Sequence, residues 1–296
     1  MVRAEPHPRP EEVRERAHRL FVEGSDPEGL DPTVLREVLR DLPIRVEALG
    51  PSFHVESAAR ALHHSHPKYY FLIDRDHLGR SAVEARWREF PDPNHDNLLI
   101  WRWRELENYF LDPAYLGKSP YLTCTQQQLE RQILSAAGRR LYFDAANLVI
   151  VQLREELKTN WIRQFASTRG FSTQKAALQK LLSRPEFSSK ARSVSQKLRS
   201  DRIEGRFKKV VGAMLDGEPR PQLGRGRWLQ MVRGKKMLPA VISKCFRVKD
   251  QQGKSLQGKV RVREVVRNLL ARPLSDQPGD FQQLHGLLSR QVREGR

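Results

Sequence analysis

The sequence predicts an α/β fold in residues 17–120, a four-stranded and mainly parallel sheet with flanking helices, followed by a basic and mostly helical region. Short apolar runs alternate with helical periodicity as far as residue 103, and only helical patterns follow. Residues 1–120 hold 17 Lys and Arg against 21 Asp and Glu, whereas residues 121–296 hold 36 against 14. Alternating strands and helices of these lengths imply parallel strands joined by crossover helices.

The expected elements follow one another closely along the chain. Residues 1–16 form a Pro- and Glu-rich lead-in. Strands are expected over 18–24, 44–49, 68–74 and 97–103, with helices over 31–42, 55–64 and 81–90 between them. Further helices are expected over 126–138, 141–166, 174–182, 227–246 and 260–273, and in the tail after residue 278. Residues 184–226 are rich in Ser, Arg, Lys, Gly and Pro, which leaves a charged strand pair and a mobile insertion as alternatives.

Acidic residues stand where the expected strands end. Glu23 closes the first strand, and Asp74 and Asp76 follow the third. Glu107 comes shortly after the fourth strand. The carboxyl ends of parallel strands meet at one edge of a sheet, where ligands bind in open α/β folds. Clustered carboxylates repel one another without a cation, and oxygen ligands suit Mg²⁺ or Mn²⁺, so the sequence predicts a metal site at this edge. For Glu107 the alternative is an acid favoured at a helix N-terminus.

The composition narrows the class of protein. Hydrophobic residues make up 39% of the 296 residues, and no apolar run approaches the roughly 20 residues that cross a bilayer. We expect a cytoplasmic protein without a membrane segment. Cys124 and Cys245 stand far apart in the sequence and predict neither a disulfide framework nor a zinc site. The net charge of +22 after residue 120 predicts a surface that binds a polyanion, and nucleic acid is the first candidate.

Part of this pattern resembles a known family. A strand that ends in Glu23 and Gly24, an Asp-x-Asp at 74–76 after a later strand, and four strand–helix units resemble the Toprim domain of topoisomerases, primases and OLD-type nucleases. The Glu-Asn-Tyr-Phe run at 107–110 and residues 228–238 are similar to a branch of Toprim proteins encoded beside AAA-type ATPases in phage-defence operons, the PARIS systems among them. The resemblance covers residues 17–116, and 228–240 more loosely.

The resemblance implies a Toprim-like, Rossmann-like catalytic domain over residues 17–120 that binds Mg²⁺ or Mn²⁺. Glu23 matches the first acidic position of the family, and Asp74 and Asp76 match its Asp-x-Asp. Glu107 matches a later acidic position of this branch, either as a ligand or as a base behind the ligands. We therefore expect these four residues to be catalytic and metal-binding.

Basic residues of the later region are the candidates for nucleic-acid contacts. By the same resemblance, Lys235 and Lys236 hold the scissile phosphate, because cations stabilise a phosphoryl group in transfer. Arg225 and Arg227 lie in a Gly-rich stretch and are expected to contact the phosphate backbone. A solvated basic turn is the alternative for the lysines, and a bare loop is the alternative for the arginines.

Together these expectations describe a divalent-metal-dependent nuclease that cleaves RNA, with transfer RNA among its substrates, or DNA. The resemblance implies an antiviral defence effector that is held in check by an ATPase. That ATPase would be a separate protein, because the Gly-Lys-Ser runs at 117–119 and 253–255 both lack the earlier glycine of a P-loop. A homodimer is left open. The alternative is a non-catalytic nucleic-acid-binding or regulatory subunit of an ATPase complex. A topoisomerase- or primase-like activity would need accompanying domains that this sequence does not show.

Overall fold

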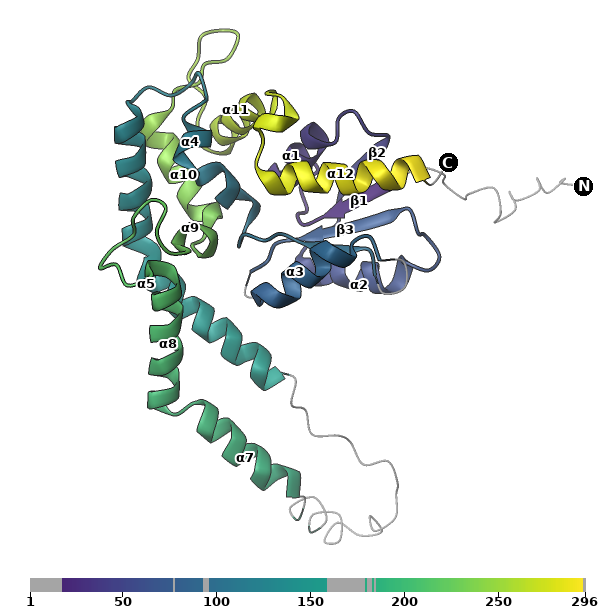
Figure 1. The fold of residues 1–296 in the computed structure, drawn as a ribbon, viewed down its shortest axis with the longest axis vertical. Coiled ribbons are helices and arrows are strands. Elements are labelled where there is room, and N and C mark those ends of the chain that lie inside the picture. Colours follow the sequence, from purple (N-terminus) through teal and green to yellow (C-terminus); the bar gives the residue numbers. More distant parts are fainter. Residues whose placement is uncertain are drawn as a thin grey trace, which may run out of the picture. The chain divides into compact units, whose positions relative to one another are not determined.

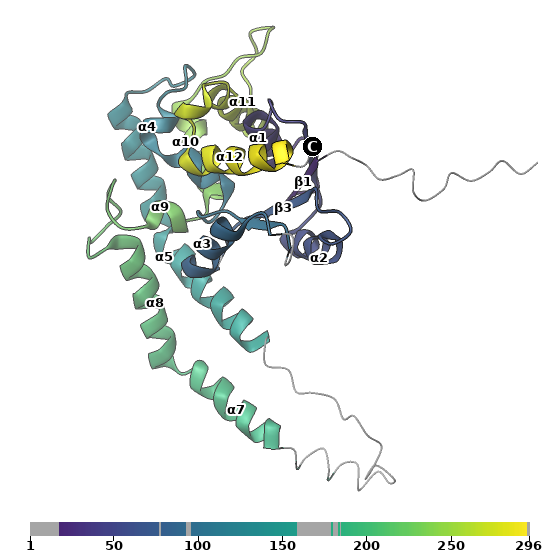
Figure 2. The same ribbon diagram turned by 45° about the vertical axis from the view of Figure 1, so that its right-hand side comes forward.

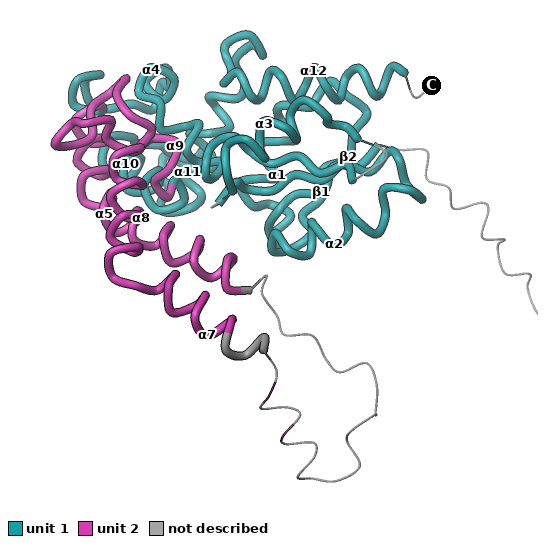
Figure 3. The backbone as a smooth tube through the Cα atoms, turned by 60° about the horizontal axis from the view of Figure 1, so that its bottom comes forward, with its two compact units in different colours: residues 1–129, 234–296 teal, residues 130–233 magenta. Residues whose placement is uncertain are grey.

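The structure, a computed structural model, describes residues 18–76, 78–92, 96–158, 179, 183 and 185–294. The chain forms two compact units, unit 1 from residues 1–129 and 234–296 and unit 2 from residues 130–233 (Figure 3). The sequence divides the chain at residue 120, whereas residues 234–296 share a unit with the sheet. The functions assigned to the predicted regions stay predictions. Within the described residues, no helix is long and apolar enough to span a membrane.

Unit 1 is built on a four-stranded sheet whose neighbouring strands are all parallel, in the order β2-β1-β3-β4 (Figure 1). The strands are β1 (His18–Val22), β2 (Ile44–Ala48), β3 (Tyr69–Ile73) and β4 (Leu98–Ile100). The crossover helices are α1 (Leu30–Val38), α2 (Ser52–Leu62) and α3 (Arg80–Glu89). The predicted α/β fold is confirmed, with β4 shorter than the expected strand over 97–103.

Helices cover both faces of the sheet. Helix α1 lies on one face beside α12 (Gly279–Glu294), and α2 and α3 lie on the other (Figure 2). Leu20 in β1 and Leu99 in β4 are fully buried, which accounts for the apolar runs that predicted these strands. Val34 and Leu35 of α1 are buried as well, so the periodic stripe of this helix faces the sheet.

The rest of unit 1 is helical. Its further elements are η2 (Leu106–Leu111), α4 (Pro113–Leu116), α10 (Gly234–Cys245), α11 (Gly258–Leu270) and η3 (Leu274–Asp276). Helix α10 packs against η2, and the backbone N–H of Thr123 donates to the carbonyl of Cys245 at 2.8 Å. The thiol of Cys124 makes a hydrogen bond with Cys245, and burial together with this contact raises the pKa of Cys245. Two free cysteines that are distant in the sequence are therefore neighbours in the fold.

Unit 2 contains most of α5 (Gln126–Lys158), a single helix where the sequence predicts two. Ile133, Ala137 and Leu141 are buried, so the helical spacing of the core continues across Gly138. The glycine lowers helix propensity without breaking the helix because packing on both sides of it supports the backbone. Residues 159–166 of the expected second helix, and almost all of the helix expected over 174–182, lie outside the described residues.

Residues 185–215 are almost entirely helical and residues 216–226 form turns and loop, so the strand pair considered for residues 184–226 is wrong. They contain α7 (Pro185–Lys197) and α8 (Ser200–Leu215), and the short α9 (Trp228–Met231) follows. Val210 and Met214 of α8 are buried at helical spacing, a signal that the charged and glycine residues of the segment obscure in the sequence.

Candidate functional site

Glu23, the first predicted acid, follows β1 at the carboxyl edge of the sheet. Its Oε1 accepts a hydrogen bond of 2.9 Å from the backbone N–H of Asp74, which joins the end of β1 to the end of β3. Gly24 has a φ of +117°, a conformation that favours glycine, and its backbone exchanges hydrogen bonds of 2.8 and 2.7 Å with Gly50 beyond β2. The chain turns at Gly24 and leaves the carboxylate of Glu23 beside β3.

Asp74 follows β3 directly and is the most deeply placed of the predicted acids. Its side chain is 2% exposed. The Oδ1 atom accepts a hydrogen bond of 3.1 Å from the backbone N–H of Leu106, and the Oδ2 atom lies 2.5 Å from the Nζ of Lys235. A buried carboxylate requires such partners, because an unpaired charge away from water is costly.

Glu107 lies in the first turn of η2, and the backbone of this turn is firmly fixed. The side chain of Asn108 accepts a hydrogen bond of 3.0 Å from the backbone N–H of Glu105, and the Glu105 side chain accepts one from the backbone N–H of Asn108. Glu107 itself is buried, and its Oε2 atom has no hydrogen-bond partner among the described residues. A buried oxygen in this state calls for a ligand or a proton.

Asp31 belongs with these acids although it does not follow a strand. It lies in the first turn of α1 directly before Pro32, a common position for an acid at a helix N-terminus. The structure brings its charge close enough to raise the pKa of Asp74 and of Glu107. The signal that could have found it is its place in the helix after β1, which starts at the same edge of the sheet as Glu23.

Lys235 is in the first turn of α10 and reaches the acids from a distant part of the chain. Its backbone N–H donates a hydrogen bond of 2.7 Å to Oε2 of Glu105, while its Nζ pairs with Asp74. Gly234 permits this approach, since a Cβ atom at position 234 would lie 2.5 Å from the Oδ1 of Asn108. The glycine therefore allows α10 to start against η2.

Glu23, Asp31, Asp74 and Glu107 form what we call the carboxylate cluster. Burial raises the pKa of Glu23 to about 7 and that of Glu107 to about 8. Burial also raises the pKa of Asp31, and that of Asp74 well above its usual range. Burial alone would lower the pKa of Lys235, but Asp74, Asp31 and Glu107 raise it above its ordinary value. The cluster therefore carries more negative charge than its lysine neutralises when every acid is ionised.

The other predicted site residues lie outside this cluster. Asp76 is exposed, and its backbone N–H donates to the carbonyl of Arg104 at 3.1 Å, although its charge still raises the pKa of Glu23. Lys236 is exposed on α10. Arg225 is exposed and Arg227 is half-buried in unit 2, ahead of α9. The nucleic-acid roles predicted for these basic residues stay predictions.

The geometry of the acids is that of a cluster closed by an ammonium group. In the described part of the chain, no three His, Cys, Asp or Glu side chains are arranged to hold a metal ion. The donors are nevertheless of the right kind for one, since carboxylate oxygens suit hard divalent cations and the Glu107 Oε2 atom is unpartnered. The Nζ of Lys235 supplies the positive charge beside Asp74.

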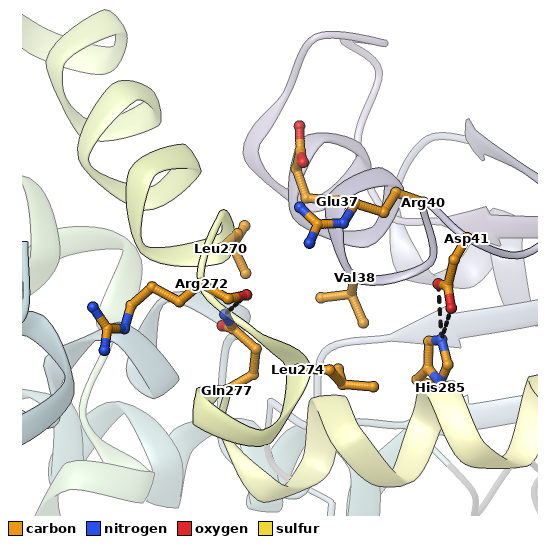
Figure 4. A pocket seen from close by; sticks show the side chains of 9 residues that line it. All are labelled: Glu37, Val38, Arg40, Asp41, Leu270, Arg272, Leu274, Gln277 and His285. Carbon is orange, nitrogen blue, oxygen red and sulfur yellow. Dashed lines mark hydrogen bonds and ion pairs between the residues drawn. The ribbon is translucent and has the colours of Figure 1, made fainter.

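A separate pocket lies between α1 and the helices at the end of the chain (Figure 4). Both carboxylate oxygens of Asp41 accept hydrogen bonds from the Nε2 of His285, at 2.9 and 3.1 Å. Arg40 and Arg272 also line this pocket, and none of the cluster acids does. The contact between Asp41 and His285 ties α12 to the segment after α1.

The fold and the site define an α/β protein with a buried carboxylate cluster at the carboxyl edge of a parallel sheet. No protein-family model matches the chain, and no curated protein matches it.

Proposed function

We propose that this chain is a divalent-metal-dependent nuclease of the Toprim type, which cleaves phosphodiester bonds in RNA, transfer RNA among them, or in DNA. One observation carries the proposal. Asp74 and Glu107, which are buried, and Glu23 and Asp31, which are half-buried, meet at the edge of the sheet where ligands bind in open α/β folds. A fold gains no stability from such crowding, so a ligand is its most direct explanation.

The donor chemistry of these residues suits Mg²⁺ or Mn²⁺, although no three described His, Cys, Asp or Glu side chains are arranged to hold an ion. Glu23, Asp74 and Glu107 would hold the ion from within the cluster, and Asp76 would join them from its exposed position after β3. When bound, the metal supplies an activated water and positive charge for the developing phosphoryl oxygens. Asp74 is oriented by the backbone N–H of Leu106, so one of its oxygens is aimed before any ligand arrives.

Two residues of the chain can act beside the metal. Glu107, with its pKa raised to about 8, can take a proton from the attacking water at its unpartnered Oε2 atom. Lys235 is fixed by its backbone to Glu105, which leaves its long side chain free to turn from Asp74 toward the scissile phosphate. Lys235 could in this way pair with Asp74 in the free protein and contact the phosphate, as predicted, once the substrate is bound.

The experiment that tests the proposal compares two Glu→Gln variants of one loop. Glu23→Gln should lower Mn²⁺- or Mg²⁺-dependent cleavage of labelled RNA and single-stranded DNA by about 10²–10³-fold, comparable to the loss of one group that stabilises the transition state, because the cation that supplies the positive charge would be held less well. Glu28→Gln, an exposed position in the same loop, should cleave like the wild type. Equal activity of the two variants, or cleavage that persists in a chelator, would contradict the proposal.

A second function is favoured by the ion pair between Lys235 and Asp74. This pair neutralises part of the cluster without any metal, and no three-ligand group is formed in the described residues. A non-catalytic nucleic-acid-binding or regulatory subunit of an ATPase complex would need no more than this. Nucleic-acid binding without cleavage in any divalent cation, unchanged by Glu23→Gln, would select this function over the nuclease.

Control by a separate ATPase and a cytoplasmic location belong to the same proposal. A nuclease free in the cytoplasm would damage its own cell, so we expect this chain to be inactive while bound to its ATPase partner and active after release. Expressed alone, the wild type should be toxic and the Glu23→Gln variant harmless. Equal toxicity of both would assign the harm to binding by the basic region.

A further inference from the structure

Helix α5 has one face that the packing of unit 2 leaves exposed. Tyr142, Phe143 and Ile150 on this face are 54%, 61% and 46% exposed, whereas Leu141 and Leu148 on the other side of the helix are buried. The helix therefore has enough apolar residues both to pack in the core and to expose some of them on this face. Large apolar side chains that gather on one exposed face mark an interaction surface.

The same face is basic. Between residues 131 and 154, every exposed position of α5 is an arginine, an aromatic or aliphatic residue, or a small residue, and none is Asp or Glu. The arginines are Arg131, Arg139 and Arg154. We call these three arginines together with Tyr142, Phe143 and Ile150 the α5 face. Arginine interleaved with exposed aromatic residues is the composition of surfaces that bind nucleic-acid strands.

A further arginine is fixed beside the Phe143 ring. The guanidinium of Arg140 lies 5.5 Å from the centre of this ring, and it donates hydrogen bonds of 3.2 and 2.8 Å to Asp144. Asp144 is fully buried and also accepts a hydrogen bond of 2.9 Å from the backbone N–H of Arg233. A buried carboxylate therefore holds a cation next to an exposed ring, which places positive charge at a surface where a base could stack.

The charge of unit 2 indicates what this face binds. Residues 130–233 hold 22 Lys and Arg against 9 Asp and Glu, so unit 2 carries +13 of the net charge of +18. Unit 1 carries the remaining +5. Protein interfaces also use aromatic residues and arginines, but the large positive charge of unit 2 favours a polyanion, and a polyanion with aromatic bases explains both the rings and the charge.

We infer that the α5 face binds single-stranded nucleic acid, with unpaired bases stacked on Tyr142 and Phe143 and phosphates held by Arg131, Arg139 and Arg154. A duplex hides the flat faces of its bases, so the rings would be of little use against one. This inference rests on the proposed function, which supplies the kind of substrate. It adds that the chain binds the unpaired regions of that substrate. Arg131 and Arg154 are 23 residues apart, about 35 Å along a helix, a distance that a strand of roughly ten nucleotides can follow.

The test measures binding apart from cleavage. Fluorescence anisotropy in EDTA would follow a fluorescein-labelled 20-nucleotide oligouridine, an oligothymidine of the same length and a 20-base-pair duplex, each with the full chain. Phe143→Ala and Tyr142→Ala should each weaken binding of the single strands about 5- to 100-fold, the range for the loss of one stacked base. Phe143→Trp should retain the affinity and Phe143→Leu should lose it, because a stacked base needs a flat ring. Arg139→Ala combined with Arg154→Ala should reduce the logarithmic salt slope by about 1.4 units, two phosphates' worth for a single strand.

Leu198→Ala is the matched control, since Leu198 is 44% exposed and lies in the same unit. It should bind like the wild type. Single-strand binding unchanged by Phe143→Ala and Tyr142→Ala would overturn the inference. Equal affinity of Phe143→Leu and wild type would also overturn it, because an apolar protein-docking surface tolerates leucine. These results leave the proposed nuclease standing, which only the metal-dependent cleavage assay on Glu23→Gln decides.

Discussion

The carboxylate cluster of unit 1 and the α5 face of unit 2 treat charge in opposite ways. The cluster buries several acids around one lysine, and burial raises the pKa of each of them. The arginines of the α5 face lie in water on a unit with a net charge of +13. Buried charge costs folding stability unless it is paired, whereas exposed charge costs little and acts over a long range. Under the proposed function, the cluster would carry out the chemistry and the α5 face would capture the polyanion.

The largest expected effect is the loss of stability when Lys235 is removed. Lys235→Ala leaves Asp74 buried without its counter-charge, which should lower the free energy of unfolding by about 3–5 kcal/mol near pH 8. Arg139→Ala on the α5 face should change it by no more than about 0.5 kcal/mol, because the position is exposed. Urea unfolding of both variants in a chelator measures the difference.

Lys236→Ala controls for the loss of a lysine from α10, since this neighbour is exposed. It should unfold like the wild type. Mn²⁺ should restore part of the stability of Lys235→Ala, because a cation near Asp74 replaces the missing ammonium. Equal stability of Lys235→Ala and Lys236→Ala would show that the charge in the carboxylate cluster contributes no more to stability than exposed charge such as that of the α5 face.

A smaller effect is expected where α12 supports the cluster. The Oδ1 atom of Asp280 accepts a hydrogen bond of 2.6 Å from Arg102, and its Oδ2 atom accepts one of 2.5 Å from the hydroxyl of Tyr109 in η2. Asp280→Asn should cost about 1–3 kcal/mol, the range for a hydrogen bond to a charged group. Gln283→Ala, which removes a more exposed contact to the same arginine, is the control and should cost less. Thermal unfolding of the two variants measures these costs, and a larger loss of stability in Gln283→Ala than in Asp280→Asn would contradict the prediction.

The smallest effect, measured per pH unit, is the pH dependence of the free energy of unfolding. The contribution of the carboxylate cluster in unit 1 is opposite in sign to that of an ion pair in unit 2. Burial raises the pKa of Glu23 to about 7 and that of Glu107 to about 8 in the folded chain, whereas the ordinary pKa of these carboxyls in the unfolded chain is 4.5. The folded state therefore binds more protons in this range, and the free energy of unfolding should fall as pH rises, by no more than about 1.4 kcal/mol per pH unit for each carboxyl. Glu107→Gln should flatten the slope measured by urea midpoints from pH 5 to 8 in a chelator. Stability that rises over this range would contradict the raised pKa values.

In unit 2 the sign is the reverse. The hydrogen bond from Arg206 lowers the pKa of Glu156, so this pair stabilises the fold above the unfolded pKa and loses its contribution as pH falls through the folded one. Both side chains are partly exposed, so Glu156→Gln should cost no more than about 1 kcal/mol.

The sequence could predict the sheet and two of the buried acids because their signals are local. The apolar runs of β1 and β3 specify buried parallel strands, and Glu23 and Asp74 are the residues that follow them. Once the strands are known to be parallel, the two carboxylates must share an edge. The structure adds that the Oε1 atom of Glu23 is close enough to accept a hydrogen bond from the backbone N–H of Asp74.

The remaining features depend on contacts that no local pattern encodes. Asp31 has the usual chemistry of a helix start, and only the fold shows that its charge reaches Glu107. The lysine in α10 was expected to contact phosphate through a resemblance, whereas its pairing with Asp74 depends on how α10 packs against η2. The helices α7 and α8 were missed because their apolar stripe is thin among charged residues.

The ion pair that closes the cluster joins two residues 161 positions apart, with all of unit 2 between them. On a ribosome the sheet and its acids emerge first, and Lys235 follows roughly 10–30 s later at ordinary rates of synthesis. A chain released before residue 235 would carry the acids but not the ammonium that neutralises Asp74, nor the helix that packs against η2. Incomplete translation products therefore lack the ion pair that closes the carboxylate cluster.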